Sequence, residues 1–89
     1  MSNPEDRGQM RIGEALKRSR TAQGIEIREV EERTKIRTKY LRALESESWE
    51  ALPDPAYAKA FLRTYAQVLG LDADALVGAY RRQVEGDRR

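Results

Sequence analysis

The stretch from residue 27 to residue 47, IREVEERTKIRTKYLRALESE, decides the fold of this 89-residue chain. Its apolar residues recur at helical spacing in two short runs, 27–34 and 38–47, and the period-two alternation typical of strands is missing. Only the three residues KIR separate the two runs. Two short helices joined by so tight a turn must cross steeply, so the stretch is predicted to be a helix-turn-helix unit. The residues expected to face inward are Val30, Leu41 and Leu44.

Helical spacing continues on both sides of this unit, so we expect an all-α fold. A predicted helix at 10–22 precedes the unit, and Gly24 follows it as a residue that readily ends a helix. Another predicted helix begins at the pair Asp54-Pro55, a strong helix start, and runs to residue 69. A last helix starts after Asp72, and its apolar side is expected to carry Leu76, Val77, Tyr80 and Val84.

The predicted helices fit a single compact domain. Eighty-nine residues are enough for one small core and too few for a second. We therefore expect a five-helix domain over 10–84, a disordered amino-terminal tail over 1–9 and a frayed carboxy-terminal tail over 85–89.

Two residue types that carry much of protein chemistry, Cys and His, do not occur in the chain. Their absence excludes disulfides, thiolate nucleophiles, imidazole bases and the common zinc sites. The acids Glu29, Glu31 and Glu32 cluster on a short predicted helix, where such a cluster is typically a solvated face, and no activated nucleophile or phosphate-binding glycine loop accompanies them. We expect no enzyme, no cofactor, no metal and no small-molecule substrate.

The chain contains no apolar run of the roughly 18 residues that a membrane span needs. The first residues, MSNPEDRGQ, carry acids and lack the apolar centre of a signal peptide. We therefore expect a soluble chain that stays in the cytoplasm.

Basic residues gather at the start of the second short helix, although the net charge of the chain is only +2. A DNA-recognition helix places donors near base edges and cations near phosphates. The candidate DNA-binding residues, which point away from the inward face, are Arg37, Thr38, Lys39 and Arg42. Glu45 and Glu47 follow directly and are expected to face the phosphates, which opposes DNA binding, so a solvated or partner-binding face stays open as the alternative.

The stretch YAKAFLRTYA at 57–66 holds three aromatic residues spaced four apart, Tyr57, Phe61 and Tyr65. At about 100° per residue, the core-facing set is Ala58, Leu62, Tyr65 and Leu69. Tyr57 and Phe61 lie on the flank of that set and widen the apolar arc beyond what a helix packed on one side requires. Either these two rings form the rim of the core under the loop around Trp49, or they are the residues that anchor a partner.

The apolar spacing around the tight turn resembles the helix-turn-helix of lambda-repressor-like DNA-binding domains, in which the third helix is the recognition helix. The positions that carry this resemblance are Val30, Ile36, Leu41 and Leu44. The sequence departs from the pattern at two positions. Glu31 stands where those domains usually have a small residue, and Lys35 stands where the turn usually has Gly.

A longer resemblance covers roughly residues 12–80. The order of motifs, TKI then YLRALE, the W-x-x-LP loop, and Y-x-x-x-FLR-x-YA-x-x-LGLD, resembles the cytoplasmic amino-terminal domain of the RodZ family of bacterial cell-shape proteins. The resemblance implies a five-helix module that contains a helix-turn-helix and binds the actin-like filament protein MreB. Aromatics early in the fourth helix, here Tyr57 and Phe61, belong to that contact. Typical members continue through a linker into a transmembrane helix, which implies the cytoplasmic face of the inner membrane.

These observations favour a filament-docking module, with a DNA-binding regulator as the alternative. A regulator that uses both surfaces is also compatible with the sequence, because the third helix and the flank of the fourth are expected to be different faces.

Overall fold

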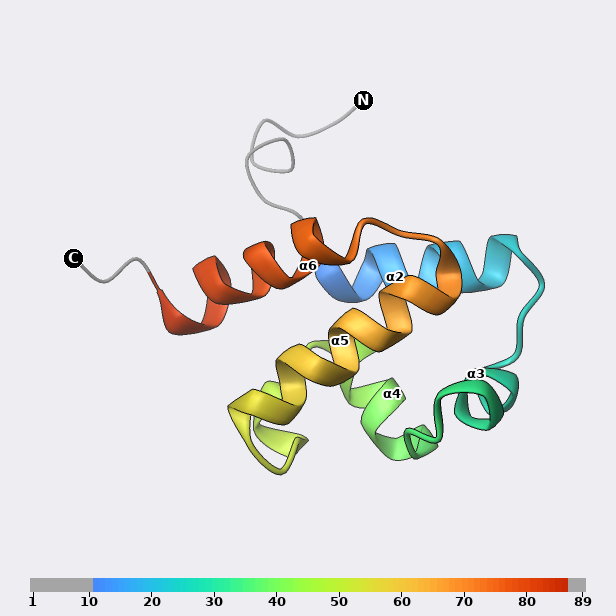
Figure 1. The fold of residues 1–89 in the computed structure, drawn as a ribbon, viewed down its shortest axis with the longest axis horizontal. Helices are drawn as coiled ribbons and strands as arrows, with labels where there is room; N and C mark the ends of the chain where they lie inside the picture. The colour runs from blue at the N-terminus through green and yellow to red at the C-terminus, as the bar shows by residue number, and fades with distance from the viewer. Residues whose placement is uncertain (1–10, 87–89) are drawn as a thin grey trace.

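The computed structural model describes residues 11–86. Within that range the chain forms five α-helices and no β-strand, which confirms the predicted all-α, five-helix architecture (Figure 1). The elements are α2 (Ile12–Ala22), α3 (Ile27–Thr34), α4 (Thr38–Ser46), the 3-10 turn η1 (Trp49–Ala51), α5 (Pro55–Leu69), α6 (Ala73–Tyr80) and the π-helical segment η2 (Arg81–Glu85). Residues 1–9, predicted to be a tail, lie outside the described range, as does Met10 at the predicted start of the first helix.

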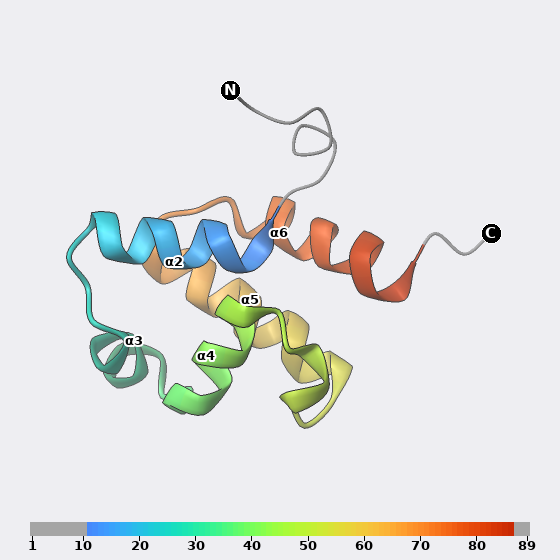
Figure 2. The same ribbon diagram turned by 180° about the vertical axis from the view of Figure 1, so that it is seen from behind.

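Helix α5 is the centre of the domain. It contacts each of the other four α-helices in the described range. Figure 1 shows α5 running diagonally across the front, with α3 at one end of the molecule and α6 continuing into η2 at the other. From behind, α2 and α4 cover the opposite side of α5 (Figure 2). The helix-turn-helix, formed by α3 and α4, is therefore held against the helix that carries the aromatic stripe.

The core forms where the apolar stripes of these helices meet. The inward positions predicted for the helix-turn-helix, Val30, Leu41 and Leu44, are each 0% exposed, and so is Tyr65 on α5. Val84 differs from expectation, since it is 41% exposed. The chain changes to a π-helix at Arg81, and the wider i→i+5 turn shifts the following side chains out of register with the buried side of α6.

Side chains and glycines fix the ends of the helices as the sequence predicts. The Asp54 carboxylate accepts a hydrogen bond from the Ala56 amide at 2.8 Å, Pro55 occupies the first turn of α5, and Gly70 ends that helix in the left-handed conformation with φ of 77°. Asp72 caps α6 by accepting from the Ala75 amide at 3.1 Å. These caps fix the start of α5 and therefore the position of Tyr57 in its first turn.

Candidate functional site

Three aromatic rings form a continuous row across α4 and α5, which we call the aromatic ladder: Tyr57, Phe61 and Tyr40. Tyr57 and Phe61 lie one helical turn apart on α5, and their ring centroids are 5.6 Å apart. Tyr40 comes from α4, and its centroid lies 5.6 Å from that of Phe61 on the other side. The ladder therefore joins α4, the second helix of the helix-turn-helix, to the central helix α5.

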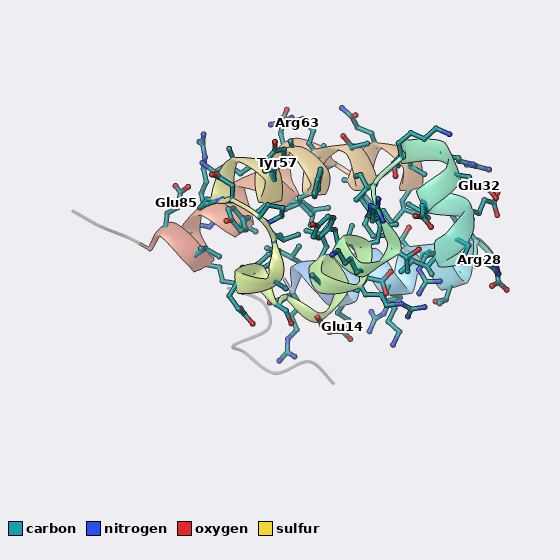
Figure 3. The ribbon with its side chains drawn as sticks, turned by 90° about the horizontal axis from the view of Figure 1, so that it is seen from below. Glu14, Arg28, Glu32, Tyr57, Arg63 and Glu85 are labelled. Atoms are coloured by element: carbon teal, nitrogen blue, oxygen red, sulfur yellow. The ribbon has the colours of Figure 1, made fainter. Side chains whose placement is uncertain are left out.

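The ladder is exposed at one end and packed at the other. Tyr57 is 52% exposed, whereas Phe61 and Tyr40 are half-buried and pack against the core. Figure 3 shows Tyr57 and Arg63 on α5 along one edge of the domain, with Arg28 and Glu32 on α3 at the far end. An exposed aromatic supported by a half-buried ring offers a partner a large apolar area that is already held in place.

The structure divides the three aromatics of α5 as the spacing predicts. Tyr65 is buried, and Tyr57 and Phe61 lie on the flank. In the loop before α5, the Trp49 ring packs against the core and meets Tyr80 of α6 edge-on, with centroids 4.9 Å apart. The ring that supports Phe61 is Tyr40.

Sequence reasoning missed Tyr40 as a part of this surface. The available signal was its position directly before the buried Leu41, which places it on the edge of the inward face of α4. That position alone does not say which neighbouring helix the ring will meet. Lys39 adds a charge at this end of the ladder, since its Nζ lies 5.1 Å from the centroid of the Tyr40 ring, within reach of a cation–π interaction.

The basic turn, which we define as Lys35, Arg37, Lys39 and Arg42, lies exposed at the surface of the helix-turn-helix. Within residues 11–86 neither Arg37 nor Arg42 pairs with an acid. Thr38, the remaining candidate DNA-binding residue, is half-buried, and its Oγ1 donates a hydrogen bond to Glu31 Oε1 at 2.8 Å. Three of the four candidates are thus free to meet a ligand, and Thr38 is engaged within the domain.

The same contacts explain the two departures from the lambda-repressor pattern. The Glu31 carboxylate reaches across the turn to the Thr38 hydroxyl and so links α3 to α4. Lys35 follows α3 with a φ of 66°, the left-handed conformation that Gly would supply at this place. The turn therefore keeps its shape without a glycine and gains an exposed ammonium.

Glu45 does not face a ligand on α4, so the expectation that it would oppose phosphates is wrong. Its side chain is 9% exposed and forms a two-pronged ion pair with Arg20 of α2, at 2.7 and 3.2 Å. The Tyr65 hydroxyl donates to the same carboxylate. Arg20 also donates to the Ile25 carbonyl at 3.1 Å. The nearly buried Glu45 carboxylate thus links α4 to α2 and α5.

Glu47 is also turned back towards the domain. Its Oε2 accepts from the Gly13 amide at 2.8 Å in the first turn of α2, and its Oε1 accepts from Gln83 Nε2 at 2.8 Å. A carboxylate at this place satisfies a free amide of the helix and is favoured by the helix dipole. With both acids engaged, the exposed surface at the start of α4 is basic.

Burial and the Glu45 carboxylate raise the pKa of Tyr65 above its usual 10.0. The hydrogen bond to Glu45 is the largest cause that raises the pKa of Arg20, with desolvation opposing it. Tyr65 therefore keeps its proton and serves as a donor to Glu45.

Within residues 11–86, no three His, Cys, Asp or Glu side chains are grouped so that they could hold a metal ion.

Comparison with known proteins gives a consistent result. Residues 15–76 match the family described as "Helix-turn-helix domain". The chain is 36% identical over 69 residues to the cytoskeleton protein RodZ of Streptococcus pneumoniae, covering 78% of this chain and 25% of that protein. It is 39% identical over 51 residues to the uncharacterized membrane protein YmfM of Bacillus subtilis, covering 57% of this chain and 18% of that protein. The chain thus spans a quarter or less of these relatives.

A solved structure shares the fold. YmfM of Staphylococcus aureus, a membrane protein for which DNA binding has been proposed, superposes with a TM-score of 0.77 at 31% identity, over 86% of this chain and 94% of that one. None of the helices in residues 11–86 has both the length and the apolar character needed to cross a bilayer.

Proposed function

Because this chain belongs to the helix-turn-helix domain family and is a RodZ-like member of it, we propose that it is a non-enzymatic docking module that binds the actin-like filament protein MreB. The contact is made by Tyr57 and Phe61. The observation that carries this proposal is the exposure of the Tyr57 ring, 52%, on a helix whose other large apolar residues are buried or half-buried. The domain works on the cytoplasmic side of the membrane in this proposal.

The physical support is the low cost of ordering this surface. Phe61 is held between Tyr40 and Tyr57, so its ring loses little freedom when a partner covers it. The Tyr57 ring can bury its apolar face while its hydroxyl stays in water. Two supported rings at the edge of a helix are typical of the few residues that dominate the energy of a protein interface.

The charges beside Tyr57 restrict how a partner approaches. Lys59 of α5 pairs with Glu85 of η2 at 2.7 Å, and Arg63 pairs with Asp74 of α6 at 2.6 Å. The Lys59–Glu85 pair is partly exposed and the Arg63–Asp74 pair is exposed, so each contributes little to stability. Their place on α5 suits a polar border around an apolar contact.

Co-sedimentation with MreB filaments tests the proposal. Tyr57→Ala should weaken binding by at least about tenfold while leaving the fold intact, because the ring is exposed. Tyr57→Phe should bind nearly as well as the original chain, since it keeps the ring. The matched control is Gln67→Ala, an exposed position on the same helix.

A second variant separates binding from folding. Phe61→Ala is expected to reduce both binding and stability because its ring is half-buried. Its affinity is therefore compared at a temperature where circular dichroism shows it folded. Undiminished co-sedimentation of the Tyr57→Ala, Phe61→Ala double variant would exclude this site.

DNA binding is the second candidate function, and one observation favours it. Glu45 and Glu47 make contacts within the domain, and the exposed cations Arg37, Lys39 and Arg42 form no ion pair within residues 11–86. The fold match with the S. aureus protein points the same way. Thr38 is expected to contribute less than the three bases, since its hydroxyl is held by Glu31.

Binding of genomic duplex fragments at moderate salt tests this candidate. Each phosphate contact adds about 0.9 to the slope of log affinity against log salt, so Lys39→Ala should reduce that slope by about 1. The control is Lys17→Ala, an exposed lysine on α2. Absence of binding even at low salt would eliminate the candidate.

A further inference from the structure

The basic turn and the aromatic ladder are one continuous surface. Tyr40 stacks on Phe61 of α5 at 5.6 Å, and the ammonium of Lys39 lies 5.1 Å from the same Tyr40 ring. Lys39 thus belongs to the basic turn and touches the end of the ladder. We expected two separate faces, one on the third helix (α4) and one on the flank of the fourth helix (α5). That expectation is wrong where Lys39 and Tyr40 join them.

The basic turn lies close to Tyr57, the exposed end of the aromatic ladder. The Lys39 Nζ lies 5.1 Å from the Tyr40 ring centroid. From there each ring centroid lies 5.6 Å from the next, in the order Tyr40, Phe61, Tyr57. A protein interface of ordinary size covers about 800 Å² on each partner, a patch about 30 Å across. A filament centred on Tyr57 and Phe61 therefore covers Tyr40 and reaches Lys39.

A nucleic-acid duplex that binds α4 covers the same residues, Lys39 and Tyr40. Recognition helices contact DNA through their amino-terminal ends. In α4 that end carries Lys39 and Arg42, and Arg37 directly precedes it as the N-cap residue. The major groove is about 12 Å wide, close to the length of the nine-residue α4, so a duplex that meets Lys39 cannot leave the adjoining Tyr40 accessible to a second large partner.

We propose that a nucleic-acid duplex on α4 blocks filament docking, so that the domain holds one of the two ligands at a time. This inference rests on the filament-docking function and its second candidate proposed above. Lys39 and Tyr40 are the shared residues. The ligand that controls docking is recognised as a polyanion by three exposed cations, Arg37, Lys39 and Arg42, which form no ion pair within residues 11–86.

Competition measures the proposal directly. The apparent Kd of the chain for MreB filaments is determined by co-sedimentation with and without a pool of genomic duplex fragments, at low salt. The free duplex concentration is set to ten times the Kd of the chain for duplex. Complete exclusion then raises the apparent Kd for filaments by about elevenfold, whereas independent sites leave it unchanged. Filaments with duplex but without the chain provide the control for direct contact between the two ligands.

Variants locate the shared residues. Tyr40→Ala should weaken filament binding by about tenfold, and Lys39→Ala should weaken duplex binding and reduce the competition, while Lys17→Ala should change neither. Circular dichroism confirms that each variant is folded. If Tyr40→Ala does not fold, Lys39→Ala alone provides the test, because its side chain is exposed.

The outcomes separate this inference from the docking function. Duplex that pellets with filament-bound chain, or a filament Kd unaffected by duplex, overturns the inference. No duplex binding at low salt overturns it as well and leaves filament docking in place. No filament binding by the unaltered chain overturns both. An apparent Kd that rises in proportion to duplex concentration supports it.

Discussion

The hydroxyl of Tyr65 on α5 donates a hydrogen bond to the carboxylate of Glu45 on α4, which at the same time holds the guanidinium of Arg20 on α2. This contact links three helices beneath the candidate surface. It also turns an acid inward that would otherwise lie beside the basic turn. Glu45 therefore affects both stability and the charge of the surface of α4.

Removing Glu45 should strongly destabilise the domain. Glu45→Ala leaves the charge of Arg20 in a nearly buried place without its partner, and we expect a loss of about 3 kcal/mol in the free energy of unfolding. Glu45→Gln keeps the side-chain volume and some hydrogen bonding, so its loss should be smaller. Denaturant titration followed by the fluorescence of Trp49, the single tryptophan, measures both losses.

Glu14→Ala is the matched control for the Glu45 variants. Glu14 also pairs with an arginine, Arg18, at 2.9 Å, but both side chains are exposed. The expected change is within about 0.5 kcal/mol. Equal losses for Glu14→Ala and Glu45→Ala would contradict a special role for the buried contact.

Tyr65 should make stability fall at high pH. Its pKa is raised in the folded domain, so the folded state holds the phenolic proton more tightly than the unfolded chain does, whose pKa is the usual 10.0. The resulting stabilisation is complete below pH 10 and is lost as the pH rises above 10 towards the higher folded pKa. Burial raises the pKa of Tyr80 as well, so it adds to the same trend.

Tyr65→Phe tests the contribution of Tyr65 to this pH dependence. The variant should be less stable by about 2 kcal/mol at neutral pH, because the Glu45 carboxylate loses a donor. Its free energy of unfolding should fall less steeply above pH 10 than that of the unaltered chain. Identical slopes for the two proteins would be inconsistent with a raised Tyr65 pKa.

Gly13 should tolerate no side chain where α2 crosses α4. A Cβ on Gly13 would lie 2.1 Å from the Glu45 carbonyl oxygen, so the two helices would have to separate. We expect Gly13→Ala to destabilise the domain by more than about 2 kcal/mol. Thermal unfolding should show a drop of roughly 10 °C, since 1 kcal/mol corresponds to about 4–8 °C in a domain of this size.

Gly78 provides a control of opposite sign. It lies within α6, and a Cβ there would meet only Arg82 Nη1 at 3.6 Å, an ordinary contact. Gly78→Ala should therefore stabilise the domain by up to about 1 kcal/mol through helix propensity. Destabilisation by both substitutions to the same extent would contradict the close crossing at Gly13.

Lys35 should be replaceable by glycine without loss of fold. Its φ of 66° is costly for a residue with a side chain, and Gly adopts this conformation freely. Lys35→Gly is expected to raise the free energy of unfolding by up to about 1 kcal/mol. The control Lys17→Gly, within α2, should lower it by about 1 kcal/mol. A destabilised Lys35→Gly would show that the lysine side chain itself stabilises the turn.

Much of the fold follows from local patterns. The spacing of apolar residues predicted α3 and α4 and the turn between them, and the cap residues Asp54 and Gly70 predicted the ends of α5. These features depend on neighbours within one or two turns of a helix. The division of the α5 aromatics, with Tyr65 buried and Tyr57 exposed, follows from the same 100° rotation per residue.

The sequence by itself determined which helices form and which face of each is apolar. Only the tertiary structure decided that Tyr40 meets Phe61, because this contact depends on how α4 is placed against α5. The same holds for Glu45, whose partner Arg20 is 25 residues away along the chain. Helical spacing says on which side a residue lies. Which side chain from another helix stands opposite is set by the packing of the helices.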